Sequence, residues 1–361
     1  MLKRSLTALF IPVFACATLN AQVLSPNHLH QPTLTPQSSG TTNGLIAVWP
    51  VNPQVVWASG RAGTFTVTTD GGQTWRAGAV PGAEALQFRD VQAFSASDAY
   101  LMSIGADPTD FRIYKTTDGG ATWTIQFENQ IPNAFYDGFA FWTPHRGIAH
   151  SDSVNGVFPD VRTTDGMTWQ DISNNMPPAL PGEFSFASSG TCVTTQGGRN
   201  AWICTGGSDI ARVLATRDGG DTWNAYDTPL FSSPSAGAFT VAFRDPHDGI
   251  VGGGDLDPGD PNNARTAISN DGGQTWTLTN PPPVTGAIFG LSYVGHSGGG
   301  VGDNGRAVVI TANDGGAAWT PDEGNTWFTL PGVTGFWAVA FASPKAGWLV
   351  GTDGRILKIS F

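Results

Sequence analysis

The sequence predicts an all-β protein, a seven-bladed β-propeller whose blades are four-stranded antiparallel sheets. Three observations predict this fold: a turn motif is repeated along the chain, its copies are nearly evenly spaced, and β-rich segments precede them. A unit of about 40 to 50 residues that offers four short strands is typical of one propeller blade. The 47 glycines and 25 prolines, with only 13% charged residues, agree with many turns and short strands.

The repeated motif is an Asp-box, first seen at residues 68–75 as Thr-Thr-Asp-Gly-Gly-Gln-Thr-Trp. Successive box aspartates are 47 to 53 residues apart. The aspartate can accept hydrogen bonds from the N–H groups that follow it, the glycines take positive φ, and the tryptophan anchors the next strand. We interpret the boxes as structural hairpin turns, because one equal site per repeat is expected of an architectural device. Their defining residues are Asp70, Trp75, Asp118, Trp123, Asp165, Trp169, Asp218, Trp223, Asp271, Trp276, Asp322 and Trp327.

An apolar segment that ends in an aromatic residue precedes each box and supplies the inner strands of each blade. The predicted blades are 43–80, 86–130, 134–176, 183–229, 236–281, 285–331 and 333–361. The sixth is irregular, because a glycine-rich run at 295–305 precedes its second strand. The seventh supplies only three strands, so we expect residues 31–37 to add the fourth and close the ring without an exposed blade edge.

The N-terminus predicts export. A short basic start precedes an apolar segment, so residues 1–21 read as a secretory signal peptide. Cleavage is expected after Ala21 or after Ala17, and a lipoprotein processed at Cys16 is an alternative. Residues 22–361 then form a single periplasmic or extracellular domain, which we expect to be a monomer. No later stretch is apolar enough to span a bilayer. The net charge of −11 argues against nucleic acid or an anionic membrane as partner.

The two remaining cysteines, Cys192 and Cys204, flank a predicted hairpin turn at 197–200. This turn would place them nearly opposite each other on neighbouring strands. In an oxidising compartment we expect a disulfide, and the alternative is a pair of buried thiols. No histidine lies close in sequence, so neither is expected to be a catalytic nucleophile.

Polar residues are concentrated where three consecutive blades begin, on the face opposite the Asp-boxes. At the corresponding place the other blades offer apolar residues, at 45–46, 238–239, 288–289 and 336–337. Loops on this face carry the expected site of a propeller. The predicted ligand- or partner-binding residues are Arg89, Asp90, Tyr136, Asp137, Asp152 and Glu183, with His150 and Ser151 beside Asp152. The alternative is that Arg89 pairs with Asp90 or Asp137 and that the set only satisfies buried polar groups.

An enzymatic interpretation uses the same residues. In a glycoside hydrolase, Glu183 or Asp137 would act as acid/base, and Tyr136 or another carboxylate such as Asp90 would act as nucleophile. Two carboxyl groups that line an open cleft would favour this enzyme, whereas burial against Arg89 would favour a binding role. Sialidase chemistry would want three convergent arginines, and only Arg89 lies on this arc.

Three further arginines, Arg112, Arg212 and Arg265, each precede a box aspartate by six residues. Because they recur in the same place, and because Asp110 and Asp209 lie close by, we expect local Asp–Arg pairs rather than a site for a polyanion.

We expect no cofactor. Asp255, Asp257 and Asp260 have a spacing that calcium loops use, but the downstream bidentate glutamate is absent, so calcium is an alternative to a solvated acidic loop. His28 and His30 are a lesser hint of a metal. There is no zinc-type spacing of Cys and His and no phosphate-binding Gly-Lys-Ser/Thr turn.

The boxes resemble those of BNR/Asp-box propellers. The sequence outside the boxes resembles the bacterial branch of the photosystem II assembly and stability factor-like family, whose members are relatives of the sortilin and sialidase propellers. The segments that carry this resemblance lie at 56–60, 81–91, 134–138, 180–183, 189–192 and 347–351. The resemblance implies an exported seven-bladed propeller and assigns no reaction. The sequence therefore favours a non-catalytic scaffold that binds a protein or peptide opposite the boxes, with a carbohydrate-active hydrolase, and so a glycan ligand, as the alternative.

Overall fold

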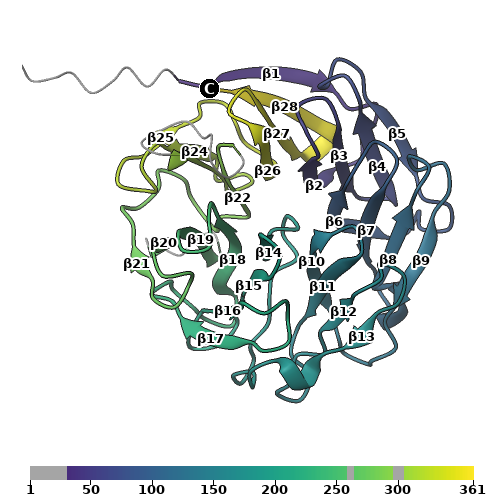
Figure 1. Cartoon of the computed structure of the whole chain (residues 1–361). Coiled ribbons are helices and arrows are strands. Elements are labelled where there is room, and N and C mark those ends of the chain that lie inside the picture. The colour runs from purple at the N-terminus through teal and green to yellow at the C-terminus, as the bar shows by residue number, and fades with distance from the viewer. Residues whose placement is uncertain (1–30, 258–263, 296–304) are drawn as a thin grey trace, which may run out of the picture. The chain divides into compact units, whose positions relative to one another are not determined.

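The computed structural model describes residues 31–257, 264–295 and 305–361, which form seven four-stranded antiparallel sheets arranged as a ring (Figure 1). The predicted fold and blade count are confirmed. The predicted signal peptide, with Cys16, and the two N-terminal histidines lie outside the described residues. Within the described ranges, no helix is long and apolar enough to cross a membrane.

In each of the first six blades the strands follow chain order from the channel outward. Blade one contains β2 (Leu45–Pro50), β3 (Val56–Gly60), β4 (Thr64–Thr68) and β5 (Arg76–Ala79). Blade two contains β6 (Gln87–Ala93), β7 (Ala99–Ile104), β8 (Arg112–Thr116) and β9 (Thr124–Glu128). Blade three contains β10 (Tyr136–Thr143), β11 (Arg146–Ser151), β12 (Val161–Thr163) and β13 (Gln170–Asp171).

The second half of the chain repeats this arrangement. Blade four contains β14 (Val193–Gln196), β15 (Asn200–Cys204), β16 (Arg212–Thr216) and β17 (Asn224–Asp227). Blade five contains β18 (Ala236–Phe243), β19 (Gly249–Asp255), β20 (Thr266–Ser269) and β21 (Thr277–Leu278). Blade six contains β22 (Gly290–Tyr293), β23 (Val308–Thr311), β24 (Ala317–Thr320) and β25 (Phe328–Thr329). Blade seven contains β26 (Phe336–Ser343), β27 (Ala346–Gly351) and β28 (Arg355–Ser360), with β1 (Thr33–Ser38) as its outer strand.

The two ends of the ring close as predicted. β1 pairs antiparallel with β28, from Thr33 opposite Ser360 to Ser38 opposite Arg355. Gln37 extends this closure to blade one, because its Oε1 accepts from Nε1 of Trp348 and from Nε1 of Trp75, both at 3.1 Å. The N-terminal strand thus stabilises the contact between the last blade and the first.

The Asp-boxes are self-contained hydrogen-bonded turns. In the first box, Asp70 accepts from the backbone N–H of Thr74 (2.9 Å) and from its hydroxyl (2.6 Å). The Thr68 hydroxyl donates to Asp70 (2.8 Å) and accepts from the N–H of Gly72 (2.9 Å). The hydroxyl and N–H of Thr74 lower the pKa of Asp70 to about 2. With these bonds made inside the turn, the carboxylate is already occupied by its own repeat.

Blade four departs from the prediction. Its innermost strand begins at Val193 rather than near residue 183, and residues 186–191 instead run across the channel. Gly190 makes this path possible, since its φ is +75° and a Cβ there would lie 2.4 Å from Oδ1 of Asp90. The segment contacts other blades from inside the ring: the carbonyl of Ala187 accepts from Arg89, and the hydroxyl of Ser189 donates to the carbonyl of Phe289.

The predicted disulfide is not formed, because Cys192 and Cys204 are both free, buried thiols. They face each other as predicted, and the N–H of Cys204 donates to the carbonyl of Cys192 (2.9 Å). However, the sulfur of Cys192 packs against β10, where a Cβ on Gly138 would lie only 2.7 Å from it. Burial raises the pKa of both thiols, so neither is an activated nucleophile.

A substitution of Gln37 by leucine should weaken the ring closure. The variant leaves two indole N–H groups without their acceptor, and we expect a loss of about 1 to 2 kcal/mol in the free energy of unfolding. Urea denaturation followed by circular dichroism measures this loss. The matched control is Gln73→Leu, an exposed glutamine in the first Asp-box, which should change stability by less than about 0.5 kcal/mol. Equal midpoints for the two variants would contradict the assigned role of Gln37.

Candidate functional site

The candidate site is at the end of the channel where the innermost strands begin. Strands one and three of a blade run in the same direction, and an Asp-box follows strand three, so the strand-one starts lie on the opposite face. The turns between strands one and two adjoin the boxes instead; for example, the N–H of Gly71 donates to the carbonyl of Gln54 (2.9 Å). The two faces therefore carry different chemistry.

A β-bulge lies close to the start of the innermost strand in five blades, and its extra residue is at the channel mouth. A bulge bends its strand and redirects a side chain. The extra residues are Ile46, Arg89, Asp137, Phe239 and Trp337. In blade six Phe289, directly before β22, has the corresponding place. The residues that the sequence analysis matched with one another at the starts of the blades therefore do occupy equivalent places, except in blade four.

Arg89 does not pair with either predicted aspartate. Its Nη1 donates to the carbonyl of Ala187 (3.0 Å), and its guanidinium lies over the Trp337 ring, 5.7 Å from the centroid. Burial and the neighbouring Arg61 guanidinium lower the pKa of Arg89 to about 10, which still leaves the side chain charged at neutral pH. Both arginines are accessible to solvent, Arg61 more than Arg89. This corner of the mouth is therefore positively charged.

Asp90 is a structural residue of the inner wall. Its two carboxylate oxygens accept from the N–H of Val91 (2.7 Å) and from the N–H of Phe139 in blade three (2.9 Å). The side chain is buried, and burial raises its pKa. Asp90 thus connects two blades at a bulge, and its oxygens are not directed at solvent.

Asp137 lies against Asp152, and the two carboxyl groups are close enough to share a proton. Asp137 is fully buried, and no N–H or O–H of the described residues satisfies either of its oxygens in hydrogen-bonding geometry. Asp152 is partly exposed, and its Oδ1 accepts from the N–H of Ser185 (2.9 Å). Burial, followed by the charge of Asp152, raises the pKa of Asp137 well above its ordinary value, and burial raises that of Asp152. Because burial disfavours two charges here, the pair is arranged to hold one proton, and the more deeply buried Asp137 has the more strongly raised pKa.

Glu183 and Tyr136 are each buried and committed to contacts within the protein. Glu183 forms a two-pronged ion pair with Arg212, in which Nε of the arginine donates to Oε1 at 2.8 Å and Nη2 donates to Oε2 at 2.5 Å. The hydroxyl of Tyr136 donates to the carbonyl of Pro159 (2.7 Å). Neither side chain is placed to attack a ligand or to transfer a proton to it.

His150 and Ser151 are likewise enclosed. Nδ1 of His150 lies 2.9 Å from the carboxylate of Asp160, which also accepts from the N–H of Ser151. Both His150 and Asp160 are almost fully buried. The structure thus brings Arg89, Asp137 and Asp152 together around residues 185–187. It separates Asp90, Tyr136 and Glu183 into distinct buried contacts.

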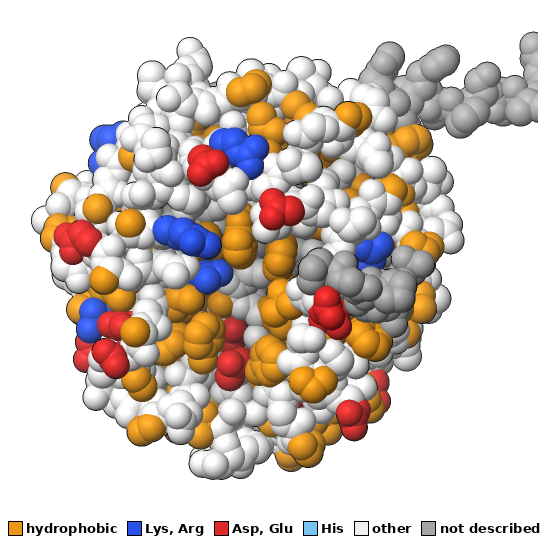
Figure 2. Space-filling model, turned by 180° about the vertical axis from the view of Figure 1, so that it is seen from behind, with side chains coloured by type: hydrophobic (Ala, Val, Ile, Leu, Met, Phe, Trp, Pro, Cys, Tyr) orange, Lys and Arg blue, Asp and Glu red, His pale blue; other side chains and the backbone are white. Residues whose placement is uncertain are grey.

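Aromatic side chains form the larger part of the site, and the sequence analysis passed over them as apolar positions. Consecutive ring contacts join Phe186 to Phe239 (3.7 Å, stacked), Phe239 to Phe289 (5.8 Å), and Phe289 to Trp337 (5.3 Å, stacked). Phe184 contacts Phe186 at the other end (4.9 Å). We call these five residues the aromatic arc. On the side of the ring opposite that of Figure 1, hydrophobic side chains gather around the centre, with Lys and Arg beside them (Figure 2).

The signal for the arc was present in the sequence. Phe239, Phe289 and Trp337 are aligned with Arg89 at the start of their blades, and aromatic residues at exposed positions are common in binding surfaces. Phe184, Phe289 and Trp337 are partly exposed in the structure. Phe184 and Phe186 depend on the path across the channel, which the repeat pattern does not predict.

Each of the recurring arginines has partners within the described part of the protein. Arg112 pairs with Glu128 on the neighbouring strand (2.8 Å), and Arg212 pairs with Glu183. Arg265 donates instead to the carbonyls of Val284 and Gly286. The prediction was correct in that these arginines are used within the fold; the correction is that Arg112 and Arg212 pair with glutamates rather than with aspartates.

The calcium alternative is only partly within the described residues. Asp255 accepts from the hydroxyl of Ser235 (2.7 Å) and from the N–H of Asp257 (2.9 Å), whereas Asp260 lies outside the described ranges. No group of three or more His, Cys, Asp or Glu side chains in the described part of the chain is arranged to hold a metal ion.

Taken together, Asp90, Asp137 and Glu183 are buried and Asp152 is partly exposed, so these four groups do not form the pair of carboxyl groups across an open cleft that a glycosidase uses. The accessible groups are two arginines, three aromatic rings and the partly exposed Asp152. Such a surface can hold an apolar side chain against the rings and an anionic group against the guanidinium groups.

The architecture and the boxes define the class of protein as an Asp-box β-propeller. The BNR/Asp-box repeat family profile matches residues 267–278, which include the fifth box. The chain is 24% identical over 243 residues to the chloroplastic photosystem II stability/assembly factor HCF136 of Cyanidioschyzon merolae (strain NIES-3377 / 10D). This match covers 62% of the chain and 51% of the relative, so the chain spans about half the length of that curated relative.

Solved structures with the same fold include one described as YCF48 bound to D1 peptide, with a TM-score of 0.62 and 17% identity over 92% of this chain and 98% of that one. YCF48 from Cyanidioschyzon merolae has a TM-score of 0.59 and 17% identity over 91% of this chain and 98% of that one. The predicted resemblance to Asp-box propellers and to photosystem II assembly factors is confirmed, and at this identity the structural likeness shows the fold alone.

Proposed function

We propose that the protein is a non-catalytic binding scaffold that takes a protein or peptide partner on the face opposite the Asp-boxes. The observation that carries this proposal is the aromatic arc, which ends at the Arg89 guanidinium over Trp337. The similarity to a stability/assembly factor, and to a propeller described as bound to a peptide, supports a protein or peptide as the ligand. The basic N-terminal start and the apolar segment after it support export to the periplasm or the cell exterior.

The segment recognised would present an apolar or aromatic side chain together with a carboxylate. Phe289 and Trp337 are stacked and partly exposed, so a side chain can lie on them with little rearrangement. Arg89 is held in place by Ala187 and by the Trp337 ring, which reduces the entropy lost when it binds an anion. No observation favours the hydrolase alternative over this role.

The test is capture of partners from envelope extract by wild type and by two variants, Arg89→Gln and Trp337→Ala. Each substitution removes one of the two contact types, so we expect captured partner to fall about 10-fold or more for each. Thermal melts establish that both variants fold. The matched control is Arg199→Gln, because Arg199 is exposed on the hairpin beside the Asp-boxes and its loss should leave capture unchanged. Unchanged capture by both folded variants would overturn the proposed face.

A further inference from the structure

A second hollow lies in the channel on the side of the Asp-boxes, separate from the aromatic arc. It has a volume of about 450 Å³, which is within the range of small-molecule sites. Its walls are the later halves of the innermost strands, and its rim includes Phe94, Gly197 and Arg244, which belong to the turns between strands one and two. None of the partner-binding residues proposed above lines it apart from Asp90.

Residues 186–191, which cross the channel and which we call the channel segment, close the inner end of this cavity. The hydroxyl of Ser189 donates to the carbonyl of Phe289 (2.5 Å) and contacts the hydroxyl of Thr191 (2.6 Å). Thr191 in turn contacts the hydroxyl of Thr240 in blade five (2.7 Å). Because residues 187–191 contact blades two, five and six from within the ring, the hollow is a blind cavity rather than an open pore.

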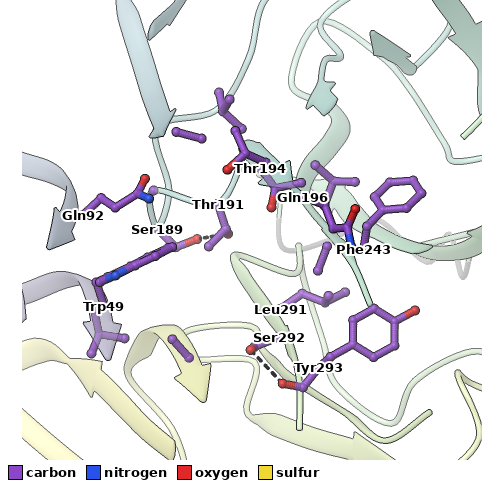
Figure 3. Close-up of a pocket in the computed structure, with 18 of the residues that line it drawn as sticks. Trp49, Gln92, Ser189, Thr191, Thr194, Gln196, Phe243, Leu291, Ser292 and Tyr293 are labelled. Atoms are coloured by element: carbon purple, nitrogen blue, oxygen red, sulfur yellow. Dashed lines mark hydrogen bonds between the residues drawn. The ribbon is translucent and has the colours of Figure 1, made fainter. Parts of the chain in front are cut away.

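The walls combine aromatic faces with neutral polar groups. Trp49, Trp142 and Phe243 line the cavity and are partly exposed. In Figure 3, Trp49 lies on one side of the hollow and Thr194 with Gln196 on another, so that a ring and hydrogen-bonding groups border the same space. Aromatic rings stack against the C–H faces of a sugar, and hydroxyl and amide groups form hydrogen bonds with its hydroxyl groups.

Several of these polar groups are unused. Within the described ranges, no group accepts from Nε1 of Trp49, and no partner contacts the hydroxyl of Thr194. The amide oxygen of Gln196 receives only a long contact from Asn200 (3.5 Å). Each of these side chains can therefore bond to a ligand without breaking a bond inside the protein.

Among the described residues that line the cavity, only Asp90 and Arg244 are charged, and both are already paired within the protein. Asp90 is occupied by two backbone N–H groups, and Arg244 pairs with Asp245, Asp248 and Glu323. A charged ligand would lose its hydration without gaining an oppositely charged partner, whereas the hydroxyl groups of a neutral ligand can pair with the unused donors and acceptors.

We propose that this cavity is a second binding site that takes a neutral saccharide. The aromatic walls, the unused neutral donors and acceptors, and the compensated charges together select a ligand that is polyhydroxylated and uncharged. The site is independent of the proposed partner surface, because the channel segment lies between the two.

Isothermal titration calorimetry with maltose, cellobiose and N,N′-diacetylchitobiose tests this proposal, with glucuronate as the charged probe. We expect at least one neutral disaccharide to bind with a Kd of about 1 mM or tighter, and glucuronate to bind at least about 10-fold more weakly. Trp49→Leu should weaken binding about 10-fold, and Thr194→Ala about 3- to 10-fold. Thr277→Ala, at an exposed position of β21, is the matched control and should bind as wild type does.

The milder Thr194 variant keeps the test valid if Trp49→Leu does not fold. The proposal is overturned if none of the three neutral disaccharides binds, if Thr194→Ala binds as tightly as Thr277→Ala, or if glucuronate binds as tightly as the neutral sugars.

Discussion

Replacement of Glu183 by alanine is expected to lower the free energy of unfolding by about 3 to 5 kcal/mol, among the largest effects of a single substitution in this protein. The carboxylate has no exposed surface, and the Arg212 side chain is 9% exposed. Removing the acid leaves a buried guanidinium without its two-pronged partner. The Thr205 hydroxyl also loses its shorter hydrogen bond, to Glu183 at 2.6 Å, and keeps only the 3.3 Å contact with the carbonyl of Arg212. Chemical denaturation with urea measures the change.

The matched control is Glu128→Ala, because Glu128 forms the corresponding pair with Arg112 at the surface. There the side chains are 21% and 36% exposed, so water replaces the lost partner and the expected cost is about 0 to 1 kcal/mol. If the two variants were equally stable, the Glu183–Arg212 pair would not be a structural element. If Glu183 were a catalytic acid, its replacement should change the free energy of unfolding little. The same comparison of unfolding free energies therefore separates the structural role from the enzymatic interpretation.

Repetition explains which parts of this fold could be predicted. The Asp-boxes recur with their own hydrogen-bond partners, so their turns and the spacing of the blades can be read without knowledge of the rest of the chain. The closing strand followed from a missing element in the last repeat, and β1 pairs with β28 as expected. Features that each repeat contains, or visibly lacks, are therefore accessible to sequence reasoning.

Features that break the repeat were not predicted. Residues 186–191 cross the channel because Gly190 can approach Asp90 closely, and a single glycine among 47 carries no such signal. The partner of Arg212 is Glu183, 29 residues away, and its identity depends on that path. The bulges that direct Arg89 and Trp337 into the channel mouth come from strand register, which the residue pattern does not fix at a strand's first residues.

The two ends of the channel present different side chains, and each end suits one of the two proposed binding roles. The mouth opposite the boxes presents Arg89 and the aromatic arc, whereas the cavity beside the boxes presents Trp49 and neutral side chains. The same segment, residues 186–191, contributes to both: Phe186 belongs to the arc, and Ser189 closes the cavity. Its conformation is fixed by buried contacts, and beside it lie Asp137 and Asp152, two carboxyl groups whose pKa values are raised by burial.

Substitution of Asp137 by asparagine is expected to stabilise the protein at pH 8 by about 2 to 3 kcal/mol, while the two proteins differ little at pH 4. The pKa of Asp137 is raised in the folded state, so its protonated form contributes stability that is fully present below the unfolded pKa of about 4. That stability is lost as the pH rises through the folded pKa, because a second buried charge then lies beside Asp152. An asparagine donates to Asp152 at every pH and removes this loss.

Thermal melts of wild type and Asp137→Asn between pH 4 and pH 9 test this expectation, and the difference in Tm should grow as the pH rises. Asp152, Asp160 and Arg89 also influence the site, so the comparison uses a single substitution that keeps its shape. Asp227→Asn, at an exposed position of β17, removes the same charge and should show no such trend. A difference that shrinks as the pH rises would mean that Asp137 is ionised in the folded state. The carboxylate would then have to be neutralised by Arg89, which would draw that guanidinium away from the surface proposed to bind the partner.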